Sequence, residues 1–191
     1  MVKPRGRDVA SAHGNPGISL RDILRMGSKR EETIVTWMIE TVREAAVTSA
    51  DVFRLYADPS TWSEWGHNAK WASADGPLVE GGTVDVRANY GKVYPSRIRR
   101  LVADRALELE VRPPLLTVIQ TYEVEERPNG ARVRHALELS GRLSGILRLG
   151  GAAWFYQRLL DREVEKVIEL AGAHNGSAVG RSTSDDAPTA S

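Results

Sequence analysis

The chain has 191 residues, with 26 Lys and Arg against 25 Asp and Glu, a formal net charge of +1 and no cysteine. This length fits one folded domain, and the balanced charge gives no general attraction to nucleic acid. The lack of cysteine excludes disulfides, thiolate nucleophiles and cysteine-ligated metals. The sequence has no run of about 18 consecutive apolar residues, so no membrane-spanning helix is predicted. We therefore expect a cytoplasmic protein without nucleic-acid or integral membrane contact.

Both ends of the chain have the composition of disordered segments. Residues 1–32 are rich in Gly, Pro, Ser and basic side chains and predict a basic leader without stable structure. Met26 is an alternative start to Met1, and residues 19–24 have the pattern of a helix that is too short to form without a partner. Residues 174–191 are polar and predict a disordered tail, which leaves residues 33–173 as a single domain.

The predicted domain begins with a strand and two short helices. Residues 34–46 are rich in β-branched and apolar side chains and indicate a strand. Their alternation is not clean, so it does not decide which face of the strand is buried. Ser49 is a candidate N-cap for an apolar helix that ends near Asp58, and a second short helix follows Pro59. This pair lacks the basic face that DNA recognition by a helix-turn-helix requires.

Four later segments alternate apolar and polar residues with the period of two that is typical of half-buried strands. Pro128-Asn129-Gly130 separates the last two and predicts a hairpin turn, because Asn-Gly accepts the positive φ of such turns. One buried face and one wet face indicate an antiparallel sheet. The residues predicted to face inward are Val84, Val86, Ala88 and Tyr90; Leu107, Leu109 and Val111; Val118, Gln120, Tyr122 and Val124; and Val133, His135, Leu137 and Leu139.

A further segment, which lies between the first two of these strands, does not alternate cleanly. Ile98 and Leu101 fall on opposite faces, so either a β-bulge intervenes or an arginine points inward. Arg100 faces inward if Ile98 does, and Arg97 and Arg99 face inward if Leu101 does. Both alternatives stay open at this point.

A long amphipathic helix is predicted from Gly150 to Gly172, after a glycine-containing run over residues 141–149 that changes the direction of the chain. Such a helix needs a sheet to cover. Its apolar stripe consists of Tyr156, Leu160, Val164, Val167 and Ala171.

The order of these elements, a strand, two short helices, a meander of strands and a long helix, predicts an α+β fold with its helices on one face of the sheet. Two stretches also carry a resemblance: TSADVFRLYADPSTWSEW, and HALELSGRLSGILRLGG with the long helix after it. Over about residues 35–173 the chain resembles the START-related, helix-grip (SRPBCC) superfamily, which includes polyketide cyclases and lipid-transfer domains. The resemblance implies a curved antiparallel sheet of about six or seven strands wrapped around the C-terminal helix, with a deep, mostly apolar cavity between them.

The inward positions and the resemblance together nominate the site residues. His135 is the best catalytic candidate, because an imidazole in a cavity can act as a base near neutral pH, although a core histidine bonded to a neighbour is the more ordinary interpretation. His67 is expected on a surface loop, and the tryptophans after Pro59 either line the entrance or pack the short helices. The predicted ligand-binding residues are Trp62, Trp65, Tyr90, Arg100, Gln120, Tyr122, His135, Tyr156 and Leu160.

Three functions remain open, and we expect neither a metal nor another cofactor, since no His pair has ligand spacing. The leading hypothesis is binding or carriage of a small hydrophobic ligand such as a lipid, polyketide or isoprenoid, with the site where Tyr156 and Leu160 approach His135 and Tyr122. The second is an enzyme similar to polyketide cyclases and aromatases that uses acid–base groups in the cavity, although no complete catalytic signature is present. The third is an interaction or regulatory module that uses the basic leader or the tryptophan-bearing helices.

Overall fold

The computed structural model describes the backbone of residues 36–179 and the side chains of residues 36–173. The expected basic leader, the possible short helix at residues 19–24 and the choice between Met1 and Met26 lie outside the described residues. The elements follow in the order β1 (Trp37–Ala45), α2 (Ser49–Ala57), the 3-10 helix η1 (Pro59–Thr61), α3 (Trp62–Trp65), β2 (Ala69–Ser73), β3 (Thr83–Ala88), β4 (Val93–Val102), β5 (Ala106–Val111), β6 (Thr117–Arg127), β7 (Gly130–Ser140), α4 (Ser144–Leu149) and α5 (Ala152–Val179).

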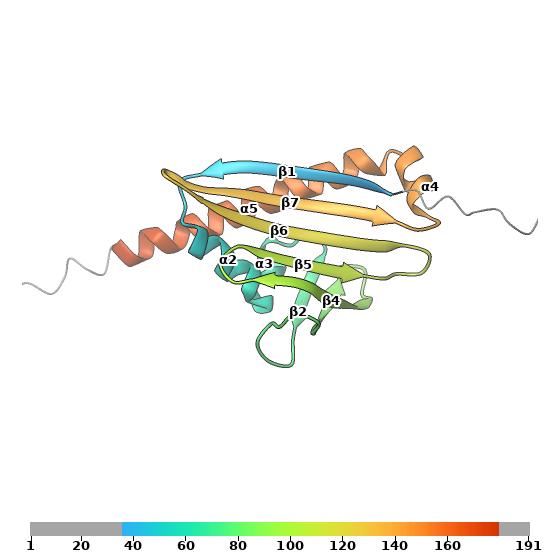
Figure 1. Ribbon diagram of the computed structural model, residues 1–191, viewed down its shortest axis with the longest axis horizontal. Coiled ribbons are helices and arrows are strands. Elements are labelled where there is room, and N and C mark those ends of the chain that lie inside the picture. Colours follow the sequence, from blue (N-terminus) through green and yellow to red (C-terminus); the bar gives the residue numbers. More distant parts are fainter. Residues whose placement is uncertain (1–35, 180–191) are drawn as a thin grey trace, which may run out of the picture. The chain divides into compact units, whose positions relative to one another are not determined.

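The strands form one seven-stranded antiparallel sheet in the order β1-β7-β6-β5-β4-β3-β2. Each strand from β2 to β6 pairs with the next one in sequence, and β1 joins the free edge of β7, where Trp37 pairs with Leu139 and Ala45 with Ala131. Figure 1 shows α5 behind the sheet, running along β1 and β7. The predicted α+β helix-grip architecture is confirmed. Strand β2, over AKWAS, was not predicted because it is too short to show a clear alternation.

The predicted alternation correctly separates the two faces of the sheet. The outer face carries ion pairs, among them Arg134 to Glu123 at 2.7 Å and Arg99 to Glu108 at 3.2 Å. The inner face supplies the core. Its fully or almost fully buried members are Val84, Ile98, Leu107, Leu109, Tyr122, Val124, Val133, His135, Leu137 and Leu139.

The irregular strand β4 contains a bulge rather than an inward arginine. Ile98 pairs with Leu109 and Arg100 with Glu108, so Arg99 is the extra residue in the ladder. Ile98 is buried, and the arginines on both sides of it are exposed. Arg100 lies 3.6 Å from Glu123 on the outer face. Of the two alternatives that the sequence left open, the bulge is therefore the correct one, because it restores the alternation at no cost in buried charge. The alternative in which Arg100 points inward to a ligand is wrong.

The turn between β6 and β7 is the predicted hairpin at Pro128-Asn129-Gly130. Gly130 has φ of 142°, a conformation that other residues rarely adopt. A Cβ at this position would also lie 2.0 Å from the carbonyl oxygen of Ala45. Only glycine fits here, and the tip of this hairpin therefore packs closely against the end of β1.

Helix α2 closes one end of the inner face. Its N-cap is Thr48, one residue before the predicted Ser49, and the backbone N–H of Asp51 donates to Thr48 Oγ1 over 3.1 Å. The helix contacts β5, β6, β7 and α5. Its buried side chains are Val52, Phe53, Leu55 and Tyr56.

Helix α5 has 28 residues and continues past Gly172, where the sequence predicted its end. Leu160, Val164, Val167 and Ala171 of the predicted stripe are buried, and Tyr156 is half-buried. Two side-chain hydrogen bonds hold the helix on β1: Thr41 Oγ1 donates to Asp161 Oδ1 over 2.8 Å and accepts from Gln157 Nε2 over 2.8 Å. The run before α5, expected only as a connection, forms the short helix α4.

Candidate functional site

His135 lies at the centre of a closed aromatic cluster on the inner face. Its side chain has no exposed surface, and its ring centroid is 4.8 Å from that of Tyr122, 5.5 Å from that of Tyr56 and 6.0 Å from that of Trp65. Tyr56 reaches this position from α2, and its hydroxyl is 2.8 Å from His135 Nε2. The rings fill the space over β6 and β7 at this end of the sheet, which is the end that α2 covers.

A carboxylate on α5 completes this buried arrangement. Glu163 Oε2 lies 3.7 Å from His135 Nδ1, too far for a hydrogen bond, while Glu163 Oε1 accepts from the backbone N–H of His67 over 3.0 Å. His135 Nδ1 is buried and has no hydrogen-bond partner among the described residues. The nearby negative charge favours the tautomer that carries its proton on Nδ1, in which Nε2 accepts from the Tyr56 hydroxyl. Burial, followed by the charge of Glu163, raises the pKa of Tyr56 well above its usual value, which keeps the phenol neutral and able to donate.

The same sheet face is only partly covered farther along β6. Val118 and Gln120 are half-buried, although they point to the same side as the buried Tyr122 and Val124. Half-buried inner positions continue onto the neighbouring strands, and Tyr156 of α5 is half-buried as well. We call this set the open inner face. It consists of Val86, Tyr94, Val111, Val118 and Gln120 of the sheet and Tyr156 of α5.

Tyrosines stand at one border of the open inner face. The rings of Tyr90 and Tyr94 lie 6.2 Å apart, at the turn between β3 and β4. Partial desolvation, followed by the hydrogen bond with Tyr94, raises the pKa of Tyr90 to about 12, and Tyr156 acts on it in the same direction. Near neutral pH the Tyr90 phenol is therefore an uncharged group that can donate a hydrogen bond to a ligand.

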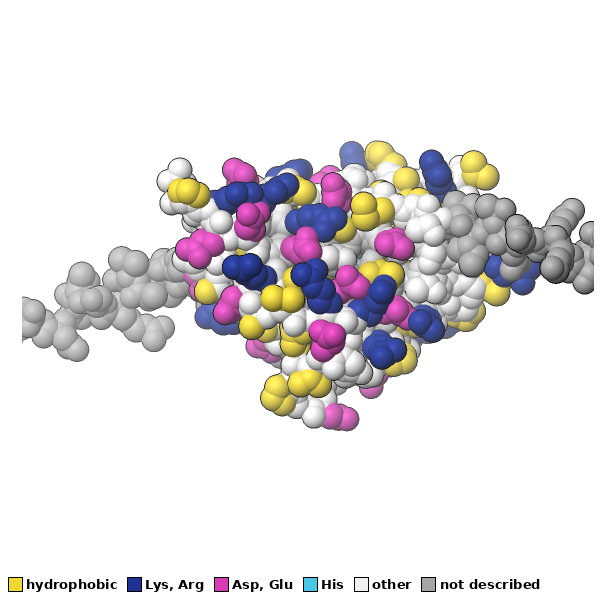
Figure 2. All heavy atoms as spheres, in the orientation of Figure 1, with side chains coloured by type: hydrophobic (Ala, Val, Ile, Leu, Met, Phe, Trp, Pro, Cys, Tyr) yellow, Lys and Arg dark blue, Asp and Glu magenta, His cyan; other side chains and the backbone are white. Residues whose placement is uncertain are grey.

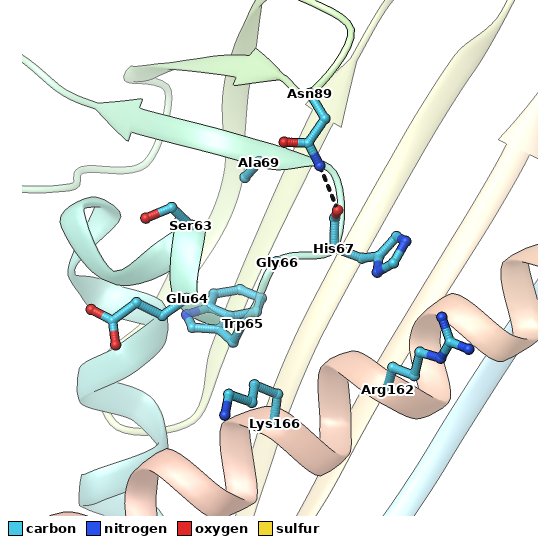
Figure 3. Close-up of a pocket in the computed structure, with 9 residues that line it drawn as sticks. All are labelled: Ser63, Glu64, Trp65, Gly66, His67, Ala69, Asn89, Arg162 and Lys166. Atoms are coloured by element: carbon cyan, nitrogen blue, oxygen red, sulfur yellow. Dashed lines mark hydrogen bonds between the residues drawn. The ribbon is translucent and has the colours of Figure 1, made fainter.

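A surface pocket of about 330 Å³ lies next to this border, between α3, β2 and α5. Figure 3 shows Arg162 and Lys166 reaching toward it from α5, with Trp65 behind them and His67 at the connection from α3 to β2. Asn89 Nδ2 donates to the carbonyl oxygen of His67 over 2.9 Å and so fixes this connection against β3. Glu64 also lines the pocket, and Lys166 Nζ is ion-paired with Glu169 at 2.9 Å, so Arg162 is the lining cation best placed to bind an anion.

The structure separates the residues that the sequence assigned to one site. Trp65, Tyr122 and His135 meet in the aromatic cluster, and Trp62 donates from Nε1 to the carbonyl oxygen of Tyr56 beside it over 3.1 Å. Leu160 is buried in a second cluster with Trp37, Leu137 and Leu139, and Tyr156 packs against that cluster.

The remaining predicted site residues lie elsewhere. Gln120 is on the open inner face, Tyr90 is 63% exposed at the turn after β3, and Arg100 is on the outer face. Tyr156 and Leu160 were expected to approach His135 and Tyr122. The two pairs instead belong to different clusters. Trp71 is exposed on β2.

Sequence reasoning missed two members of the buried arrangement. Tyr56 lies in the apolar helix predicted after Ser49 but was not named as a site residue, and Glu163 was not singled out. Glu163 is three residues after Leu160 and next to Val164, so it borders the buried stripe of α5. A carboxylate at that position, opposite the single inward histidine, was the signal that could have identified it.

The fold and these features define an α+β helix-grip protein. The family model described as polyketide cyclase / dehydrase and lipid transport matches residues 36–172, and the chain belongs to this family. None of the curated proteins matches the chain.

Solved structures share the fold at low sequence identity. Norcoclaurine synthase from Thalictrum, in complex with a transition-state analogue, is 13% identical with a TM-score of 0.58, covering 75% of this chain and 98% of that one. Protein MLL2253 from Mesorhizobium loti is 18% identical with a TM-score of 0.54, covering 72% and 98%. The di-domain ARO/CYC BexL from the BE-7585A biosynthetic pathway is 14% identical with a TM-score of 0.53, covering 88% of this chain and 55% of that one.

Two further observations bear on the kind of site. Among residues 36–173, no group of three or more acidic or histidine side chains is placed to hold a metal ion. Within the described helices, none has both the length and the apolar composition needed to cross a bilayer.

Proposed function

We propose that the protein binds or carries a small hydrophobic ligand, of the lipid, polyketide or isoprenoid type, against the open inner face. The observation that carries this proposal is the change along β6, where Tyr122 is buried but Val118 and Gln120 are only half-buried on the same face. Apolar surface that the fold leaves uncovered beside a few polar groups is how small-molecule sites are generally built. The absence of cysteine fits a cytoplasmic location, which is part of this proposal.

The polar groups at the border favour a ligand with oxygen atoms. Gln120 has both a donor and an acceptor on the open inner face, and Tyr90 and Tyr156, whose pKa values are raised, add neutral phenols. A pure hydrocarbon would leave these groups without partners, whereas a ligand with hydroxyl, ketone or carboxyl oxygens would satisfy them.

The adjoining pocket favours an anionic end on that ligand. Asn89, which lines the pocket, directly precedes Tyr90, and Arg162 lies about 9 Å along α5 from Tyr156. A ligand whose body rests on the open inner face would therefore bring one end toward Arg162 and Lys166. We propose an amphiphile with an apolar body and a carboxylate as the best-fitting class.

A pair of tryptophan substitutions tests this proposal. Val118→Trp fills the open inner face, while Ile119→Trp places the same side chain on the outer face of the same strand. With oleate and the fluorescent probe anilinonaphthalene sulfonate as ligands, we expect the first substitution to weaken binding about tenfold or more and the second to leave it unchanged. Equal affinities of both variants, or no binding by the unmodified chain, would contradict the proposal.

An enzyme of the polyketide cyclase or aromatase type is the second candidate, favoured by the Tyr56–His135–Glu163 arrangement. A histidine held between a phenol and a carboxylate has a defined tautomer, as a general base needs. Because His135 has no exposed surface, a substrate would have to displace the surrounding rings to reach it. Turnover of a poly-β-keto thioester that is lost in His135→Gln but kept in His67→Gln would favour this candidate over binding alone.

A further inference from the structure

A second surface, at α4 and the first turn of α5, exposes more apolar area than the fold requires. Figure 2 shows hydrophobic and basic side chains together at the end of the molecule where Figure 1 labels α4. We call these side chains the α4 patch. Its apolar members and their exposed fractions are Leu143 (37%), Ile146 (67%), Leu149 (91%), Trp154 (64%) and Phe155 (52%), with Leu115 (55%) on the loop beside them.

The exposure does not come from a loosely attached segment. Trp37 Nε1 donates to the carbonyl oxygen of Ser144 over 2.9 Å, and this bond is buried. Leu147 packs against the cluster that contains Trp37 and Leu160. Because Ser144 and Leu147 hold α4 against the core, the opposite side of the helix presents Ile146 and Leu149 outward. A contiguous exposed apolar patch of this kind is typical of an interaction site.

The stretch of chain that carries most of the patch has charges of one sign. Between Glu138 and Asp161 the sequence contains three arginines and no acidic residue. Arg148 is exposed on α4, and the guanidinium carbon of Arg158 lies 4.5 Å from the centroid of the Trp154 ring. The third arginine is Arg142, just before α4. The combination of protruding apolar side chains and cations indicates an anionic partner with an apolar interior.

We propose that the α4 patch docks the protein on the surface of an anionic lipid bilayer. Ile146 and Leu149 would enter the boundary between headgroups and acyl chains, Trp154 would lie at the level of the headgroups, and Arg148 would face lipid phosphates. The patch protrudes on a short helix, which suits a deformable bilayer better than a shaped protein groove.

Charge disfavours the two nearest alternative partners. A second copy of the chain would bring the same arginines against each other. The first thirty residues contain seven basic and two acidic side chains, so that segment would also repel the patch.

The docking surface also borders the proposed ligand site. The Phe155 ring lies 5.7 Å from that of Tyr156, which belongs to the open inner face. A lipid-like ligand leaving the bilayer would therefore meet the open inner face directly. Docking itself does not depend on this transfer, and the experiment below measures it without any ligand.

Vesicle binding of the full chain tests the proposal. We expect co-sedimentation with vesicles of phosphatidylcholine and phosphatidylglycerol, little with phosphatidylcholine alone, and weaker binding as salt is added. Ile146→Asp and Leu149→Asp should each weaken binding about tenfold, and Arg148→Gln and Arg158→Gln about fivefold each. The matched controls are Val79→Asp, at an apolar side chain 58% exposed on a loop, and Lys92→Gln, at an exposed cation, and both should bind as the unmodified chain does.

Three results would overturn the proposal. The first is that the unmodified chain does not bind the anionic vesicles. This includes the case in which the α4 patch binds an acidic protein and not the vesicles. The second is loss of binding that is as large in Val79→Asp as in Leu149→Asp. The third is a concentration-dependent dimer that Leu149→Asp dissociates, which would make the patch an interface between copies. Because Leu149 is 91% exposed, unfolding of the variant is not expected, and circular dichroism checks this.

Discussion

Two stretches of the same inner sheet face differ in how they are covered. Around His135, α2 and α3 bring Tyr56 and Trp65 down onto the sheet, and every ring in that cluster is buried. On the open inner face, Val118 packs only partly, against the cluster that contains Leu160, and Gln120 is half-buried. The short helices thus decide which part of the sheet is core and which part can receive a ligand.

The closed stretch should respond most strongly to loss of volume. Trp65→Ala removes a ring that touches Tyr56, Tyr122 and His135, and we expect the free energy of unfolding to fall by about 3–5 kcal/mol. Trp154→Ala, at a side chain 64% exposed, is the matched control and should change it by less than about 1 kcal/mol. Urea denaturation measures both. Equal losses would mean that the cluster is not tightly packed.

The hydrogen bond inside the closed stretch should have the next largest effect. Tyr56→Phe keeps the ring but leaves His135 Nε2 buried without a partner, and we expect a loss of about 1–3 kcal/mol in the free energy of unfolding. Tyr90→Phe removes a hydroxyl from an exposed side chain and should have little effect. If Tyr56→Phe is as stable as the unmodified chain, His135 is not held by this bond.

Alkaline pH should reveal the same cluster. Burial, followed by the charge of Glu163, raises the pKa values of Tyr56 and Tyr122 well above the usual 10.0. The unfolded chain then releases these protons first as the pH rises, so it binds fewer protons than the folded chain and the free energy of unfolding decreases above pH 10. Urea midpoints across this range should fall less steeply in the Tyr56→Phe, Tyr122→Phe double variant. An unchanged slope would assign the decrease to other groups.

The smallest effect is expected on the outer face. Arg100 is solvent-exposed and 3.6 Å from Glu123, a distance and exposure at which ion pairs contribute little. Arg100→Ala should change the free energy of unfolding by less than about 0.5 kcal/mol. It should leave the affinity for oleate unchanged. A marked loss of oleate binding would place a ligand on the outer face and would contradict binding at the open inner face.

Periodicity predicted the faces of the sheet well and the coverage of those faces poorly. The inward positions of Leu107, Tyr122 and His135 follow from alternation, which is a local property. The conflict between Ile98 and Leu101 indicated either a bulge or an inward arginine in β4. Only the pairing of the strands shows that the bulge, at Arg99, is present.

The contacts that divide the inner face join residues far apart in the chain. Tyr56 and His135 are separated by 79 positions, and no local pattern indicates that α2 places a phenol on this imidazole. Glu163 reaches the same histidine from α5. Helix placement, not side-chain pattern, determines which inward residues are covered. The sequence therefore left both a cavity role and a core role open for His135, and the structure places it in the core.

Methyl NMR during an oleate titration tests the difference between the two stretches most directly. Val118 and Val111 lie on the open inner face, while Val124 and Val133 are buried beside the aromatic cluster on the same side of the sheet. We predict large shifts for the first pair of valines and small ones for the second. Shifts of equal size in both pairs, or larger shifts at Val124 and Val133, would contradict binding at the open inner face.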